Sequence, residues 1–198
     1  MTAHAASWLE FEAGVGAAQA VDMDGVWNQH KVAGNREALT TPAYLLGATG
    51  ELARRDSTQL LYHADYVYFG TQSASCECVS DAAYAAHDYS ASTNQFVGSG
   101  HVQGIALTLS PAYAWRGTRF AIEGGPFVFW ETWHEYAYLH PTQAVRAFGG
   151  GTLGYVIGAR VERGPFGMSY RYYSASPQWR TYPGLTRGFH VLSVTYRF

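Results

Sequence analysis

The strongest constraint in this sequence is a strict two-residue alternation between large apolar side chains and small or polar ones. From residue 105 to residue 115, the odd positions hold Ile, Leu, Leu, Pro, Tyr and Trp, and the even positions between them hold only Ala, Thr and Ser. Residues 192–198 repeat the pattern, with Leu, Val, Tyr and Phe alternating with Ser, Thr and Arg. Because successive side chains of a strand point to opposite faces, both segments predict β-strands with one large apolar face.

Eight segments of this kind follow one another along the chain. They cover about residues 7–20, 42–55, 58–73, 103–116, 118–134, 151–163, 165–177 and 188–198. The breaks are short at Asp56-Ser57, Gly117 and Gly164, and long at 21–41, 74–102 and 135–150, with a shorter one at 178–187. Short turns at one end and long loops at the other are typical of outer-membrane barrels. We therefore predict an all-β fold, an eight-stranded antiparallel up-and-down transmembrane β-barrel, forming one domain over residues 1–198.

A soluble lipocalin-like barrel also has eight strands, so the choice depends on which face lies inside. The interior of an eight-stranded barrel is only just wide enough for side chains, and rows of Trp, Tyr, Phe and Leu would overpack it. Charged side chains cost several kcal/mol when they face hydrocarbon. We therefore expect Gly, Ala, Ser and paired charges inside, and large apolar side chains with aromatic girdles outside.

The same parity assigns one set of ionisable side chains to the inner face. This set comprises Glu10, Glu12, Glu51, His63, Asp65, Glu123, Glu131, Arg160, Arg171 and Arg197. Two interpretations are open: a polar conduit, or a salt-bridge network that fills the barrel and fixes the strand register. His63 and Asp65 also have a spacing at which a carboxylate orients an imidazole, although this spacing has low specificity.

The chain ends V-T-Y-R-F, with Phe198 last and Tyr196 two residues before it. This ending resembles the carboxy-terminal signal that outer-membrane barrels present to the barrel assembly machinery. The eight-strand layout is similar to that of the OmpX and OmpA-type barrels. The resemblance implies a Gram-negative outer-membrane location, lipid and lipopolysaccharide as surroundings, and assembly through Tyr196 and Phe198.

The segment Tyr170–Pro177 resembles the corresponding part of the outer-membrane lipid A 3-O-deacylases, which carry an H-x-S-N motif followed by an acidic residue. Ser174 occupies the serine position. Tyr172 stands where that family has its catalytic His, Ala175 stands where it has Asn, and residues 178–188 contain no Asp or Glu. A serine without a base is a poor nucleophile. Ser174 is thus a catalytic candidate only if this chain is a deacylase.

Composition narrows the function further. A net charge of −2 without a Lys/Arg cluster provides no electrostatic basis for nucleic-acid binding. Ala3-His4-Ala5 has the small-x-small form of a signal cleavage site, so we interpret residues 1–6 as a residual mature N-terminus. The redox state of Cys76 and Cys78 is left open.

We expect no cofactor and no metal. The leading hypothesis is a non-enzymatic surface protein that binds a partner or ligand, or modifies the envelope, through loops 21–41 and 74–102. The alternatives are a lipid A-modifying acyl hydrolase and a narrow channel for small apolar compounds. For the channel, Pro111 and Pro126 on the lipid-facing side would loosen the strand ladder.

Overall fold

The computed structural model describes residues 8–21, 30–79, 85–87, 94–137, 144–175 and 186–198, together with the side chains of most of them. The described part consists mainly of antiparallel strands: β1 Glu10–Val21, β2 His30–Ala38, β3 Thr40–Arg55, β4 Thr58–Val79, β5 Asn94–Trp115, β6 Thr118–Ala137, β7 Ala144–Arg163, β8 Phe166–Ser174 and β9 Gly188–Arg197. In this part of the chain, no helix has the length and apolar character needed to cross a membrane.

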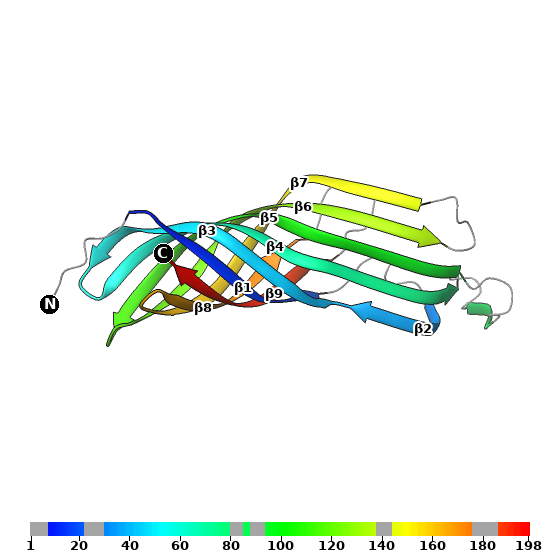
Figure 1. The fold of residues 1–198 in the computed structure, drawn as a ribbon, viewed down its shortest axis with the longest axis horizontal. Helices are drawn as coiled ribbons and strands as arrows, with labels where there is room; N and C mark the ends of the chain where they lie inside the picture. Colours follow the sequence, from blue (N-terminus) through cyan, green and yellow to red (C-terminus); the bar gives the residue numbers. More distant parts are fainter. Residues whose placement is uncertain (1–7, 22–29, 80–84, 88–93, 138–143, 176–185) are drawn as a thin grey trace.

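The sheet closes into a barrel of eight strands, in which β2 and β3 are counted together. β1 pairs with β3, each strand from β3 to β8 pairs with the next strand along the chain, and β1 also pairs with β9 from Glu12–Arg197 to Val21–Gly188. β2 and β3 are separated only by Leu39 and both pair with β4, so together they count as one of the eight strands of the barrel. Figure 1 shows this closed barrel, and the predicted eight-stranded antiparallel fold is confirmed.

The short turns lie where the sequence predicts them, all at one end of the barrel. Arg116 and Gly117 both have positive φ (49° and 79°), as a two-residue type I′ hairpin requires. Gly164 has φ 60° and precedes Pro165, which suits a type II′ turn. The C-terminus lies at the same end (Figure 1).

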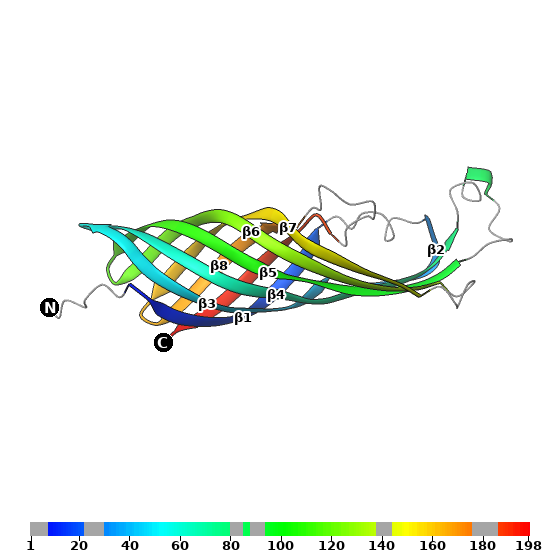
Figure 2. The ribbon, with the colours of Figure 1, turned by 90° about the horizontal axis from the view of Figure 1, so that it is seen from above.

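The long loops predicted from the sequence at 21–41, 74–102 and 135–150 were wrong in part, because much of each segment is β-strand. β2 lies within 21–41, β4 continues to Val79 and β5 begins at Asn94 within 74–102, and β6 and β7 both extend into 135–150. Backbone pairing continues beyond the apolar segments because a ladder needs only N–H and C=O groups, whereas our boundaries depended on side-chain alternation. Figures 1 and 2 show the ends of β4, β5, β6 and β7 reaching well past the barrel, with β2 alongside β4.

The outer surface of the barrel carries a continuous apolar belt. Between a third and three quarters of each side chain's surface is exposed at Phe11, Val15, Tyr44, Leu46, Leu107, Leu109, Ile122, Leu153, Ile157, Met168, Leu192 and Val194. Such an exterior is stable in hydrocarbon and would aggregate in water. It also excludes the lipocalin-like alternative, whose apolar face would be the interior.

The interior differs from the expectation in one respect. Large aromatic side chains, which we expected outside, fill the half of the interior away from the short turns: Phe69, Phe127, Phe129, Tyr173 and Phe189. They fit because other strands contribute small side chains to the same cluster, among them Ala18, Ala20, Ala43 and Ala106. Combining large with small residues fills the barrel without overpacking.

Val194→Arg tests the orientation of the belt. Val194 is 53% exposed on the outer face of β9, so an arginine there would meet hydrocarbon at a cost of up to about 2–4 kcal/mol. We expect poor insertion into phospholipid vesicles, measured as the folded fraction on a heat-modifiable gel. Ser73→Arg, on the exposed part of β4 beyond the belt, is the control and should insert like the parent chain. Equal insertion of both variants would contradict the belt.

Candidate functional site

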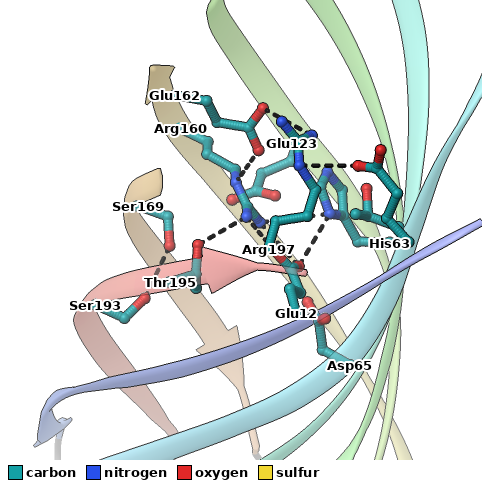
Figure 3. Close-up of polar contacts among 12 residues, drawn as sticks. Glu12, His63, Asp65, Glu123, Arg160, Glu162, Ser169, Ser193, Thr195 and Arg197 are labelled. Atoms are coloured by element: carbon teal, nitrogen blue, oxygen red, sulfur yellow. Dashed lines mark hydrogen bonds and ion pairs between the residues drawn. The ribbon is translucent and has the colours of Figure 1, made fainter. Parts of the chain in front are cut away.

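The barrel interior near the short turns holds a network of ion pairs centred on Arg160 (Figure 3). Arg160 binds Glu12 through two hydrogen bonds: Nη1 donates to Oε1 at 3.1 Å, and Nη2 donates to Oε2. Arg160 Nε lies 2.7 Å from Glu162 Oε1, and Arg160 Nη2 donates to Thr195 Oγ1 at 2.9 Å. His63 Nδ1 lies 3.2 Å from Glu12 Oε1. One cation therefore connects side chains from four strands.

The network continues toward the rim through Glu162. Arg119 Nη2 lies 2.5 Å from Glu162 Oε2, and Arg119 Nη1 donates to Gln59 Oε1 at 3.0 Å. Arg197 Nε contacts Glu10 Oε2 at 2.8 Å, with both side chains partly exposed. The Arg197–Glu10 pair is partly exposed and contributes little to stability, whereas the pairs of Glu162 and those around Arg160 are buried.

A second cluster, centred on Arg171, lies next to the aromatic layer. Arg171 binds Glu123 with two parallel hydrogen bonds of 2.7 and 2.8 Å, and its Nη1 donates to Asp65 Oδ2 at 2.6 Å. The same Nη1 lies 3.2 Å from the hydroxyl of Tyr173, whose ring packs 5.0 Å from Phe69. Arg171 is 1% exposed, so this guanidinium connects the polar half of the interior to the aromatic half.

The aromatic layer closes the interior above Arg171. Phe69 stacks on Phe189 with ring centroids 4.3 Å apart, and Phe127 lies 5.2 Å from Tyr173. All four rings are fully buried. Of the two interpretations of the inward charges, this arrangement favours the network that fills the barrel over the polar conduit.

Not every predicted inner residue joins the two clusters. Glu51 instead pairs with Arg54 at the end of β3, where Arg54 is half exposed. Glu131 is buried farther along β6, beyond the aromatic layer. The side chains of Cys76 and Cys78 lie outside the described part.

Arg119, Glu162 and the aromatic layer were not among the residues we predicted from the sequence. The parity that selected Arg160 also selects Glu162, and the parity that selected Arg171 also selects Tyr173. The alternation along the strands would therefore have identified both Glu162 and Tyr173 as inward-facing. We set the aromatic residues aside on grounds of size, without considering the alanines of the same cluster.

The outer face of β8 and β9 carries a third group of side chains. Ser174 ends β8 and is half-buried, and Tyr172 pairs across the ladder with His190 of β9. His190 Nδ1 is 2.7 Å from the hydroxyl of Tyr170, and its ring lies 5.1 Å from that of Tyr172. A histidine therefore lies on the same face as Ser174, although it comes from the next strand. The hydroxyl that contacts its Nδ1 belongs to Tyr170, and Tyr170 and Ser174 lie on opposite sides of Tyr172 along β8.

Two further histidines lie beyond the apolar belt, on the part of the sheet that leaves the barrel. His101 of β5 packs beside Tyr68, with ring centroids 5.4 Å apart. Partial burial lowers the pKa of His101, and the neighbouring charge of His134 lowers it further. His101 therefore stays neutral over a wider pH range than a free histidine.

Comparisons with known proteins found several similar solved structures. Solved structures similar to this chain include Ail, the attachment invasion locus protein of Yersinia pestis (14% identity, 96% of this chain and 98% of that one, TM-score 0.47). Neisserial surface protein A (12%, 98% and 100%, 0.41) and the outer membrane enzyme PagL (13%, 96% and 98%, 0.42) are also similar. No family model and no curated protein matches. At these identities and TM-scores, the similarities assign neither a family nor an activity.

The class of protein follows from the structure itself. A closed antiparallel barrel with an apolar exterior, a filled polar and aromatic interior, and short turns at one end is a transmembrane β-barrel of the outer-membrane type.

Arg171→Met tests the inner cluster. It would leave Asp65 and Glu123 buried without their cation, and breaking a buried pair costs about 3–5 kcal/mol. We expect a loss of that order in the free energy of unfolding, measured by urea titration in vesicles. Arg54→Met removes a half-exposed partner and should cost less than about 1 kcal/mol. Similar losses for both variants would contradict a special role of Arg171.

Proposed function

We propose that this chain is a non-enzymatic surface protein of the bacterial outer membrane, and that it binds its partner through the sheet that projects beyond the barrel. The observation that carries the proposal is the unequal length of the strands. β4, β5, β6 and β7 have 20 to 22 residues, whereas β1, β8 and β9 have 9 to 12. A tilted membrane-spanning strand needs only about 9–11 residues.

The excess length forms a sheet rather than separate loops. β4 and β5 stay paired up to Cys78–Asn94, and β6 and β7 up to Tyr136–Ala144. About ten residues at roughly 3.3 Å each give strand extensions on the order of 30 Å. A paired sheet of this length holds its surface in place, which lowers the entropy cost of binding.

The projecting sheet also has two edges. In the described pairings, β2 pairs with β4 alone, and the first residues of β7 pair with β6 alone. An edge strand presents backbone N–H and C=O groups to an extended segment of another protein. We infer a protein partner that meets this sheet from outside the cell.

The remaining expected partners fit the same proposal. The apolar belt would contact lipid and lipopolysaccharide, and Tyr196 with Phe198 would be read by the barrel assembly machinery. Phe198 also has a structural contact, because its N–H donates to Phe11 O at 3.0 Å and its C=O accepts from Phe11 N at 3.3 Å. The filled interior supports a role outside the barrel in preference to a channel.

A truncation tests the projecting sheet. Ser73 and Ser99 face each other across β4 and β5, so residues 74–98 can be replaced by Asn-Gly, the sequence of a two-residue hairpin. We expect cells expressing the truncated chain to lose adhesion to cultured epithelial cells, measured as bound bacteria per cell. Arg116→Asn, which makes the same Asn-Gly turn at the other end of β5, should adhere like the parent chain. Undiminished adhesion of the truncated chain, with its barrel folded, would refute the proposal.

A lipid A hydrolase is the second candidate, and His190 is the observation that favours it. Its position opposite Tyr172 places an imidazole on the face that carries Ser174. A base on the adjacent strand would replace the histidine that the deacylase pattern lacks.

Mass spectrometry of lipid A from a Gram-negative host expressing this chain separates the two functions. We expect an unchanged spectrum, because the partner of His190 Nδ1 is the hydroxyl of Tyr170 and not a carboxylate, and a base without an orienting acid activates a serine poorly. Loss of one acyl chain that disappears with Ser174→Ala and with His190→Ala would instead establish the hydrolase.

A further inference from the structure

Three arginines at the short-turn rim of the barrel take no part in the ion-pair networks. Each is exposed and lies in or directly before a different short turn: Arg55, Arg116 and Arg163. No ion pair joins any of them to a carboxylate in the described part of the chain, whereas Arg54 nearby is paired with Glu51. Against these three cations the turns hold one carboxylate side chain, that of Asp56, so this rim carries excess positive charge.

Arg163 lies on the lipid-facing side of this rim. It pairs with Thr118 of β6 on one side and with Phe166 of β8 on the other. Thr118 in turn pairs with Trp115 of β5. Residues directly opposite each other in a ladder share a face, and both aromatic side chains of this row are more than half exposed on the outside of the barrel. Arg163 therefore lies between lipid-facing aromatic side chains, at the edge of the apolar belt.

Arg116 lies on the same side of the rim. Its guanidinium carbon is 5.0 Å from the centre of the Trp115 ring, which is a cation–π contact with a lipid-facing side chain. Trp115 and Arg163 flank Thr118 in the ladder, and neighbouring strands lie roughly 4.8 Å apart, so the Cα atoms of Trp115 and Arg163 are about 10 Å apart. Two cations without a carboxylate partner are thus close together where the belt ends.

We propose that Arg116 and Arg163 bind the headgroups of anionic phospholipids in the leaflet that meets the short turns. Aromatic side chains at the edge of an apolar belt mark the depth of the headgroups. A guanidinium binds phosphate oxygens with parallel hydrogen bonds. A headgroup with net negative charge is attracted to these cations, whereas the ammonium of a zwitterionic headgroup offsets the attraction. Arg55 is next to Asp56, so the site comprises Arg116 and Arg163 alone.

Trp115 provides a reporter at the site itself. Its emission is the part of the tryptophan fluorescence that Trp115→Phe removes. The folded chain is placed in vesicles that mix phosphatidylglycerol with phosphatidylcholine of the same acyl chains, and one of the two lipids is brominated near the headgroup end of a chain. Bromine quenches tryptophan at short range, so exchanging the brominated lipid gives the relative binding constant of the two lipids beside Trp115.

We expect phosphatidylglycerol to bind more tightly than phosphatidylcholine, by about fivefold for each arginine, at an ionic strength of about 0.15 M. Arg163→Gln and Arg116→Asn should each lower this preference about fivefold, measured against the same variant with Trp115→Phe. Asparagine suits the positive φ of residue 116, so the turn is retained. Arg54→Gln is the matched control, because it removes the same charge from the same rim but at an arginine that already has a carboxylate partner. It should leave the preference unchanged.

Three results would each overturn the proposal, in chains shown to be folded on a heat-modifiable gel. Equal binding of the two lipids by the parent chain would leave these arginines to water or to a soluble partner. Equal losses with Arg54→Gln and Arg163→Gln would mean that the preference reflects the net charge of the rim and not a site. A preference that survives both Arg116→Asn and Arg163→Gln would belong to another part of the barrel.

Discussion

Closure of the sheet between β1 and β9 is the interaction on which the rest of the structure depends. A strand in hydrocarbon has no water to satisfy its N–H and C=O groups, so an open edge there is not viable. The β1–β9 ladder removes that edge, and the hydrogen bonds between Phe11 and Phe198 extend it to the last residue. Phe198 therefore takes part in closing the barrel, in addition to its resemblance to the last residue of an assembly signal.

Closure with eight strands makes the interior narrow, and the narrow interior determines its contents. Charged side chains near the short turns are stable there because each buried guanidinium lies against carboxylates, as Arg171 does against Asp65 and Glu123. Farther along, aromatic rings fill the same width where other strands supply alanines. A filled interior leaves the outer surfaces of the molecule available for binding, and the proposed function concerns one of them, the projecting sheet.

Much of the architecture was predictable from the sequence because the period of two is a local property. It predicted the eight strands of the barrel. The sizes and charges of the side chains on the two faces then indicated that the apolar face meets lipid. The strand extensions were not predictable in this way, because residues 74–79 and 94–102 lack the apolar alternation and pair only because their neighbours in the ladder do. The aromatic layer was missed because a size argument applied to one strand takes no account of the other strands.

The sequence by itself determined the class of fold and, within each regular stretch of strand, which side chains share a face, since both follow from alternation along a single strand. Only the tertiary structure decided which side chains meet. Glu12 and Arg160 are 148 residues apart, and His190 and Tyr172 come together only through the register of β8 and β9. Register between strands is set by the closed barrel as a whole, and no single segment of the chain contains it.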